Sequence, residues 1–373
     1  MKKNTGLITL AGVVGAGTAA VAVGAGMLYS KTVKRPKETS QDIIDEFADG
    51  EKMAVYMAQL EPVHEWMDQQ TFEDVFITAE DGIKLHAIYL SAGEMHDRLV
   101  IIHHGFTSKA EDGLFHIKAF YEMGYDILAV DLRAHGKSEG KYVGFGILDR
   151  YDTLGWIRYV RDRFGKDMRI LLHGTSMGAT TSLMALGLPE VREEVSAVIS
   201  DCAFTSPDEI FSHVMKKDYH LPAFPFMSVY NLVTQLKAGY RGDEYSTLQA
   251  LAENDTVPVL FIHGSEDKFV PVWMAEQNYE ACIAEKAKLI VEGGGHGSSA
   301  FENPELYINT EKEFLSRTEH GLELEKYVRS VEKMEGYHDG EGNREDNKAG
   351  SEEDCEDGKA GSKEDCENGK AGR

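Results

Sequence analysis

The chain has 373 residues, of which 42% are hydrophobic, so it is long enough to bury one large core or two ordinary ones. Its formal net charge of -24 argues against nucleic acid as a partner, because phosphate binding needs clustered Lys and Arg side chains. Four cysteines are too few for a disulfide framework at this length, and no Cys/His spacing is typical of a zinc site. The composition therefore favours an acidic globular protein and gives no sign of a bound metal.

Residues 1–37 predict a membrane anchor that is separate from the globular part. The run Gly6–Tyr29 contains no charged side chain, and a helix of this length covers a hydrocarbon core of about 30 Å. Basic residues on both sides of the run leave the side of the membrane open. The predicted localisation is the cell membrane, with a single pass. The alternative is a cleaved signal segment, after which the protein would be secreted.

Three further segments follow the predicted anchor. Residues 38–70 are polar with a helical pattern and predict a linker that leads into an N-terminal helix. Residues 71–334 alternate short apolar runs with amphipathic stretches and predict the globular domain. Residues 335–373 are acidic. Within them, the sequence unit that begins at Ser351 recurs from Ser362. Because this last segment has almost nothing apolar to bury, we expect a disordered tail, with metal binding by its carboxylates and thiols as the weaker alternative.

The apolar runs of the globular domain predict a mixed sheet. Two strand-like runs flank Glu80-Asp81-Gly82 and predict an antiparallel hairpin. The later runs are rich in Ile, Leu and Val and are separated by helical segments, which favours parallel strands covered on both faces. These strands are expected at Leu99–His103, Ile127–Val130, Arg169–His173, Ala197–Ser200, Val259–His263 and Leu289–Val291.

A candidate nucleophile follows the third of these runs. The segment Gly174–Gly178 has the pattern G-x-S-x-G and lies between a predicted strand and the helix-like stretch Ala179–Leu186. Small residues are needed there because the strand and the helix come close together. The Ser176 hydroxyl is then held above the sheet, at a helix N-terminus that favours developing negative charge. The alternative is an ordinary turn rich in Gly and Ser.

A serine nucleophile needs a base, and the base needs an acid that orients it. His296 lies in a glycine-rich loop after the last predicted strand, and Asp267 follows the strand before it. Both positions lie beyond the carboxyl ends of strands, where open α/β sheets place their sites. Glu266 and Asp201 are the alternative acids, and a helix cap is the structural alternative for Asp201.

The oxyanion of an acyl-transfer reaction also needs hydrogen-bond donors. The backbone N–H of Met177 is one candidate, because Met177 follows the nucleophile. The backbone N–H of Phe106, in the loop after strand Leu99–His103, is the second. Only backbone groups are needed at these two positions, so the side chains are free to vary.

Four other histidines lie near predicted strand ends, and we expect each to make structural hydrogen bonds. They are His103, His135, His173 and His263. Cys202 is expected to be a buried thiol.

Four motifs in this order resemble those of the α/β-hydrolase family, in particular its serine aminopeptidase-like and monoacylglycerol-lipase-like branch. They are His104-Gly105-Phe106, Asp131–Ser138, Gly174–Gly178, and Gly264–Asp267 with Gly295-His296-Gly297. The resemblance implies an α/β fold with an eight-stranded sheet, mostly parallel, in which strand two is antiparallel. It also implies helices on both faces, a small helical insert after strand six and no cofactor. Ala134 is a departure, because the family often has Gly there.

The insert after strand six, about Phe204 to Ser246, is expected to set substrate specificity. The candidate substrate-binding side chains are Phe106, Phe204, Phe211 and Met215, although packing of the insert onto the sheet explains such residues equally well. An apolar pocket favours a carboxylic ester, lipid-derived or otherwise acyl-bearing, as the small-molecule substrate. Peptidase or acyltransferase activity on the same triad is the alternative, and a non-catalytic membrane scaffold is a remote one.

Overall fold

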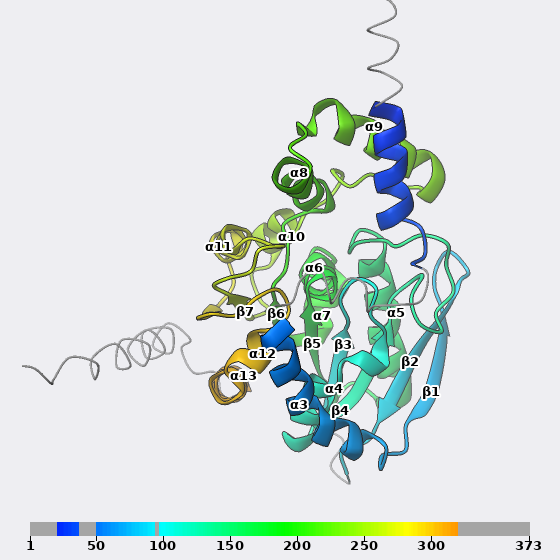
Figure 1. The fold of residues 1–373 in the computed structure, drawn as a ribbon. Coiled ribbons are helices and arrows are strands. Elements are labelled where there is room, and N and C mark those ends of the chain that lie inside the picture. Colours follow the sequence, from blue (N-terminus) through cyan, green and yellow to red (C-terminus); the bar gives the residue numbers. More distant parts are fainter. Residues whose placement is uncertain (1–20, 37–49, 94–96, 320–373) are drawn as a thin grey trace, which may run out of the picture. The chain divides into compact units, whose positions relative to one another are not determined.

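The computed structural model describes residues 21–36, 50–93 and 97–319 (Figure 1). The predicted tail and the first part of the predicted anchor, residues 6–20, lie outside the described residues. One eight-stranded sheet has the strand order β1-β2-β4-β3-β5-β6-β7-β8. The strands are β1 (Glu73–Thr78), β2 (Lys84–Leu90), β3 (Arg98–His103), β4 (Asp126–Asp131), β5 (Arg169–Thr175), β6 (Val195–Asp201), β7 (Val259–Gly264) and β8 (Lys286–Val291).

The pairing of the strands confirms the predicted mixed sheet. Strand β2 is antiparallel to both β1 and β4, and all other neighbours are parallel. The hairpin between β1 and β2 turns at the predicted place, where Gly82 has a φ of 87° that favours glycine. Each of the six predicted apolar runs lies within one of the strands β3 to β8.

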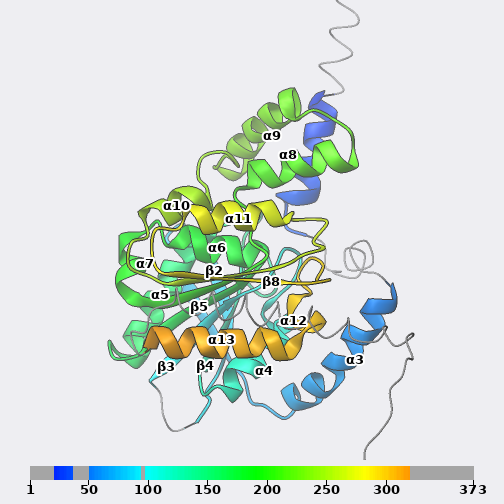
Figure 2. The ribbon, with the colours of Figure 1, turned by 90° about the vertical axis from the view of Figure 1, so that its left-hand side faces the viewer.

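Helices cover both faces of the sheet, as predicted (Figure 2). Side chains of α5 and α6 pack into one hydrophobic cluster, whereas those of α4 and α13 pack into a second cluster on the other face. Successive side chains of a strand point to opposite faces of the sheet and so contribute to both clusters. In β5, Ile170 and Leu172 belong to the first cluster and Leu171 belongs to the second. The helices are α3 (Gly50–Met67), η1 (Ala110–Asp112), α4 (Leu114–Glu122), α5 (Asp149–Phe164), α6 (Met177–Ala185), α7 (Pro189–Glu194), α8 (Pro207–Asp218), α9 (Ala223–Ala238), α10 (Thr247–Glu253), α11 (Val272–Ala281), α12 (Ser299–Glu302) and α13 (Pro304–Glu319).

The predicted insert after strand six consists of helices α8 and α9 (Figures 1 and 2). Helix α8 begins at Pro207, and the hydroxyl of Ser206 caps it by accepting a hydrogen bond from the Glu209 amide at 3.1 Å. The capping role considered for Asp201 therefore belongs to Ser206. The insert is short, and its buried residues join the same hydrophobic cluster as α5 and α6.

The N-terminal segment differs from the expected separate anchor, because residues 21–36 pack onto the globular domain. Residues 21–32 form a helix beside α9, drawn in dark blue in Figures 1 and 2. The Thr32 hydroxyl lies 3.1 Å from the Tyr230 hydroxyl, and the Val33 carbonyl accepts a 2.7 Å hydrogen bond from the Val143 amide. The side chains of this segment that the domain buries are Ala25, Tyr29 and Val33. Among the described residues, no helix combines the length and the apolar character that a bilayer span requires.

Candidate active site

Ser176 lies at the tight turn between β5 and α6. Its φ of 55° and ψ of -114° lie in a region that residues other than glycine rarely adopt. The flanking glycines leave no room for a side chain: a methyl group on Gly174 would lie 2.3 Å from the carbonyl carbon of Gly178, and one on Gly178 would lie 2.1 Å from the His103 oxygen. The Ser176 amide donates to the Asp201 carbonyl at 2.8 Å, which ties the turn to β6.

The structure brings Ser176, His296 and Asp267 together. The Nε2 atom of His296 lies 2.9 Å from the Ser176 hydroxyl, and its Nδ1 atom lies 2.8 Å from Oδ2 of Asp267. An ionised carboxylate only accepts hydrogen bonds, so Nδ1 donates and Nε2 is left to accept from the serine. The three residues follow β5, β8 and β7, so the parallel sheet itself places them at one edge.

Asp267 is held as a buried carboxylate. Its Oδ1 atom accepts hydrogen bonds from the amides of Phe269 and Val270, each at 2.9 Å. Burial alone would raise the pKa of Asp267. The charge of His296 and the hydrogen bonds from His263 and His296 outweigh burial and hold that pKa well below its usual range. Asp267 therefore stays ionised and can stabilise a positive charge on His296.

A second histidine also contacts the acid. The Nε2 atom of His263 donates to the Val270 carbonyl at 2.8 Å and lies 3.3 Å from Oδ2 of Asp267. Sequence reasoning gave His263 only a structural hydrogen bond and missed its contact with the carboxylate. The four-residue separation of His263 and Asp267 across a tight strand-to-loop turn was the available signal.

The two alternative acids lie elsewhere. Glu266 is exposed, whereas Asp267 is buried. Asp201 is buried, but its carboxylate accepts hydrogen bonds from the hydroxyls of Tyr307 at 3.2 Å and Ser299 at 3.4 Å. Burial raises the pKa of Asp201 to about 6. Since both ring nitrogens of His296 already have partners, the geometry favours Asp267 as the orienting acid.

The two predicted oxyanion donors flank Ser176. Met177 is the first residue of α6, so its amide belongs to the free N–H groups of the helix N-terminus. The loop after β3 lies against the nucleophile, because a methyl group on Gly105 would be 3.7 Å from Cβ of Ser176. Phe106 follows Gly105 directly. Donation to an oxyanion by these two amides stays a prediction.

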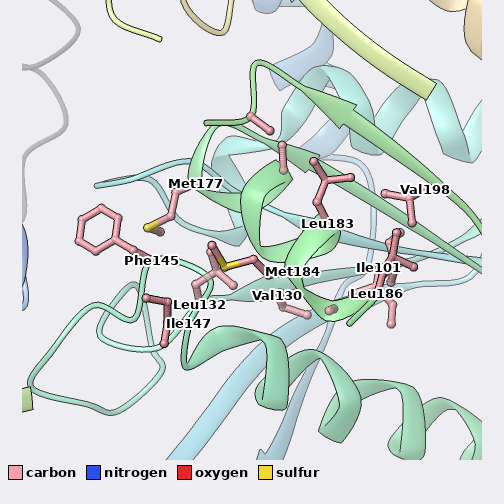
Figure 3. Close-up of a cluster of buried hydrophobic side chains, with 14 of the residues drawn as sticks. Ile101, Val130, Leu132, Phe145, Ile147, Met177, Leu183, Met184, Leu186 and Val198 are labelled. Carbon is pink, nitrogen blue, oxygen red and sulfur yellow. The ribbon is translucent and has the colours of Figure 1, made fainter. Parts of the chain in front are cut away.

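Three of the four candidate substrate-binding side chains lie close to an aromatic residue that sequence reasoning missed. The Phe145 ring lies 5.3 Å from the Phe106 ring, 5.1 Å from Phe211 and 6.5 Å from Phe204, measured between centroids. Figure 3 shows Phe145 and Met177 in the same hydrophobic cluster. Phe204, Phe211 and Met215 are buried and Phe106 is half-buried. An aromatic residue between two glycines, Gly144 and Gly146, was the signal for Phe145.

The Asp131–Ser138 stretch supports the loops around the site. The carboxylate of Asp131 accepts hydrogen bonds from the amides of Ala110 and Lys137, both at 2.8 Å, and lies 2.6 Å from Nδ1 of His86. Ala134 has a φ of 62°, in the left-handed region that favours glycine. This conformation explains why Gly is frequent at the matching position of the family.

Of the four histidines expected to make structural hydrogen bonds, three do so and one does not. His103 lies 3.0 Å from the Ser182 hydroxyl and 3.1 Å from that of Thr153, and His135 lies 3.0 Å from the Arg133 carbonyl. His263 bonds as described above. Neither ring nitrogen of His173 has a hydrogen-bond partner, so the prediction for His173 is wrong.

Known proteins resemble this chain in sequence and in structure. The sequence profile of a family described as alpha/beta hydrolase fold matches residues 98–224. The uncharacterized protein YqkD of Bacillus subtilis (strain 168) is 33% identical over 216 residues, which are 58% of this chain and 70% of that protein. The uncharacterized protein YfhR of Escherichia coli (strain K12) is 28% identical over 234 residues, 61% of this chain and 75% of YfhR.

A solved structure extends the likeness to the whole sheet. The esterase Pf2001 of Pyrococcus furiosus superposes with a TM-score of 0.54 at 26% sequence identity, covering 69% of this chain and 95% of the esterase. The strand order, the strained serine turn and these relatives agree with one another. The chain belongs to the α/β-hydrolase family.

Proposed function

We propose that this α/β hydrolase is a serine hydrolase that cleaves carboxylic esters through an acyl-enzyme intermediate. The observation that carries the proposal is the continuous hydrogen-bonded path from the Ser176 hydroxyl through His296 to Asp267, with steps of 2.9 and 2.8 Å. Both steps lie within the range expected for a nucleophile, its base and the orienting acid.

The proposed reaction has two halves. Nε2 of His296 takes the Ser176 proton as the hydroxyl oxygen attacks the ester carbonyl, and the amides of Phe106 and Met177 stabilise the oxyanion. The imidazolium then gives its proton to the leaving alcohol oxygen as the ester C–O bond breaks and the carbonyl re-forms, which leaves the acyl group on Ser176. In the second half, water attacks the acyl carbon, and its proton passes through His296 back to Ser176. The ionised Asp267 stabilises the imidazolium in both halves.

An ester with an apolar acyl group is the proposed substrate. Phe106 is half-buried, follows Gly105 in the loop beside the serine turn, and has its ring against that of Phe145. Hydrophobic and aromatic side chains line most small-molecule pockets, so aromatic rings in this loop favour an apolar acyl group. Esters are favoured over amides because the Pyrococcus furiosus relative is an esterase.

We further propose that the enzyme works at a membrane. The uncharged run Gly6–Tyr29 supports this, although residues 6–20 lie outside the described residues. Exposed apolar side chains on the described part of that run and on the neighbouring insert add support, because soluble surfaces rarely concentrate them. These side chains are Val23, Met27, Phe224, Leu232 and Leu236.

Covalent labelling tests the serine mechanism directly. A fluorophosphonate probe should modify the full chain at Ser176 at neutral pH, and Ser176→Ala should abolish the labelling. Hydrolysis of p-nitrophenyl esters of rising chain length should then show a preference for medium acyl groups.

Two results would overturn these proposals separately. Folded protein that is not labelled at neutral pH contradicts the serine mechanism and favours the non-catalytic scaffold. Labelling at Ser176 together with activity only on acetate or on aminoacyl amides keeps the mechanism but rejects the apolar acyl substrate.

A further inference from the structure

Three side chains with metal-binding atoms meet inside the domain, away from Ser176. They are His116 of α4, His173 of β5 and Glu311 of α13, and one ligand atom from each lies within 4.8 Å of the others. His173 and Glu311 are fully buried, whereas His116 is half-buried. Strand alternation turns His173 toward α4 and α13, the face on which Leu171 is buried. Figure 2 shows α4 and α13 on this face.

The polar atoms of this cluster are unpaired. Both ring nitrogens of His173, both carboxylate oxygens of Glu311 and Nδ1 of His116 are buried without a hydrogen-bond partner. Leaving a buried polar group unpaired costs about 1–3 kcal/mol, and more for a charged group. Five such atoms in one place, beside the rings of Phe120 and Tyr307, are unusual in a folded domain.

A direct hydrogen bond does not explain the arrangement. Nε2 of His173 lies 3.6 Å from Oε1 of Glu311, which exceeds the ordinary N–H···O distance of about 2.7–3.2 Å. Two ligands that share a tetrahedral zinc ion, each at about 2.0–2.1 Å, are separated by about 3.3–3.5 Å. The spacing of His173 and Glu311 therefore suits an ion between them better than it suits a shared proton.

We propose that His116, His173 and Glu311 bind one Zn²⁺ ion. Two imidazoles and one carboxylate suit zinc and not calcium or magnesium, which prefer oxygen ligands only. The half-buried His116 gives the ion a path from solvent, and a water molecule would complete the tetrahedron. The ion joins α4 and α13 to β5 three residues before Ser176, so its role is to hold the strand that carries the nucleophile.

Metal content of the full-length protein tests the site. Protein stripped with EDTA and dialysed against ZnCl₂ should hold about one zinc per chain, and the unfolding midpoint should rise by about 5 °C at roughly 100 times the dissociation constant. Glu311→Gln, which keeps the shape of the side chain, and His173→Gln should each weaken zinc binding by at least about 100-fold. An unchanged far-UV circular dichroism spectrum and a cooperative thermal transition report that each variant is folded, whether or not Ser176 is the nucleophile.

Matched variants exclude other zinc sites. Cys202, Asp267 and His296 form a second group that could hold an ion, so His296→Gln must keep the bound zinc. The double variant Cys355→Ser and Cys366→Ser must keep it as well, because the two tail thiols are soft ligands outside both groups.

Wild-type protein alone gives an independent readout. X-ray absorption at the zinc edge should show only nitrogen and oxygen neighbours, including imidazole scattering. A sulfur neighbour, zinc that persists in Glu311→Gln, or the absence of stoichiometric zinc would each overturn the proposal, and the last result would assign the cluster to a shared proton.

Discussion

Two buried aspartates, Asp201 and Asp267, show how the surroundings assign different tasks to one residue type. Each ends or follows a strand beside the serine turn, and each is less than one-tenth exposed. Asp267 accepts two backbone N–H groups and contacts two histidines, which stabilise its charged form. Asp201 accepts only from hydroxyl groups, so burial dominates and its pKa rises to about 6. The charged form is therefore stabilised at Asp267, where the base needs it, and is disfavoured at Asp201 relative to an ordinary carboxyl group.

The activities of two variants test which of the two aspartates orients His296. Asp267→Asn should lower kcat/KM for an ester by roughly 10⁴-fold, because the amide holds His296 in the wrong tautomer. Asp201→Asn should keep activity within about tenfold, since the amide oxygen of the new side chain can still accept a hydrogen bond from Tyr307. Steady-state kinetics on one p-nitrophenyl ester compares the two. Equal losses in both variants would contradict the choice of Asp267 as the orienting acid.

Asp201 also predicts a pH dependence of stability. Its pKa is about 6 in the folded chain and about 3.9 in the unfolded chain, so the folded state binds the proton more tightly between these values. Asp201 leaves the free energy of unfolding unaffected below pH 4, where both states are protonated. The free energy of unfolding then falls by about 2–3 kcal/mol as the pH rises through 6. Asp201→Asn removes this penalty. The unfolding midpoint of Asp201→Asn minus that of wild type should therefore be larger at pH 7.5 than at pH 4. Calorimetry in the presence of EDTA measures both midpoints.

The opposite trend would contradict this account of Asp201. If the midpoint of Asp201→Asn falls further below wild type as the pH rises, the carboxylate is stabilising when charged. The hydrogen bonds from Tyr307 and Ser299 would then outweigh burial.

At the scale of elements, the contact between the helix of residues 21–32 and α9 depends on a glycine. A methyl group on Gly24 would lie 2.9 Å from the Phe226 ring, whereas one on Gly26 would meet nothing within 4 Å. Gly24→Val should therefore weaken the contact by about 1–3 kcal/mol through overpacking. Trypsin cleavage after Lys31 should become about fivefold faster or more, because the segment opens more often.

Gly26→Val is the matched control, since it makes the same change in helix propensity without the clash. Its cleavage rate should match that of wild type. Equal acceleration in both variants would show that helix propensity, and not packing on α9, governs the segment.

At the scale of the whole molecule, the sequence predicted what depends on local pattern and on chain order. The strands β3 to β8 are continuous apolar runs, and the site residues follow them in the order Ser176, Asp267, His296, so a parallel sheet had to bring them to one edge. The packing of residues 21–36 could not be predicted, because an uncharged helix suits a bilayer and a protein surface equally well.

Contacts between distant parts of the chain explain the other omissions. Phe145 contacts side chains from two other loops and from α8, and His116, His173 and Glu311 come from elements with no common motif. Such clusters arise from the fold and leave no fixed spacing in the sequence.

If the enzyme acts at a membrane, the exposed apolar side chains of α9 should be needed for hydrolysis at a lipid surface. Leu232 and Leu236 are 49% and 74% exposed on this helix, which lies against the helix of residues 21–32. Leu232→Glu with Leu236→Glu should reduce hydrolysis of an ester dispersed in anionic vesicles by about tenfold, because burial of two leucines at the interface is lost. Hydrolysis of a dissolved short-chain ester should stay unchanged, since neither residue lies at Ser176.

Ile283→Glu is the control for this prediction. Ile283 is 62% exposed, but it lies between α11 and β8, at the far edge of the sheet from β1. Added charge there should leave both activities as they are. A selective loss on vesicles in the α9 variant alone means that the insert meets the lipid. Equal rates on vesicles for all three proteins mean that the exposed face of α9 has no part in reaching the substrate, and anchoring would then rest on the N-terminal run alone.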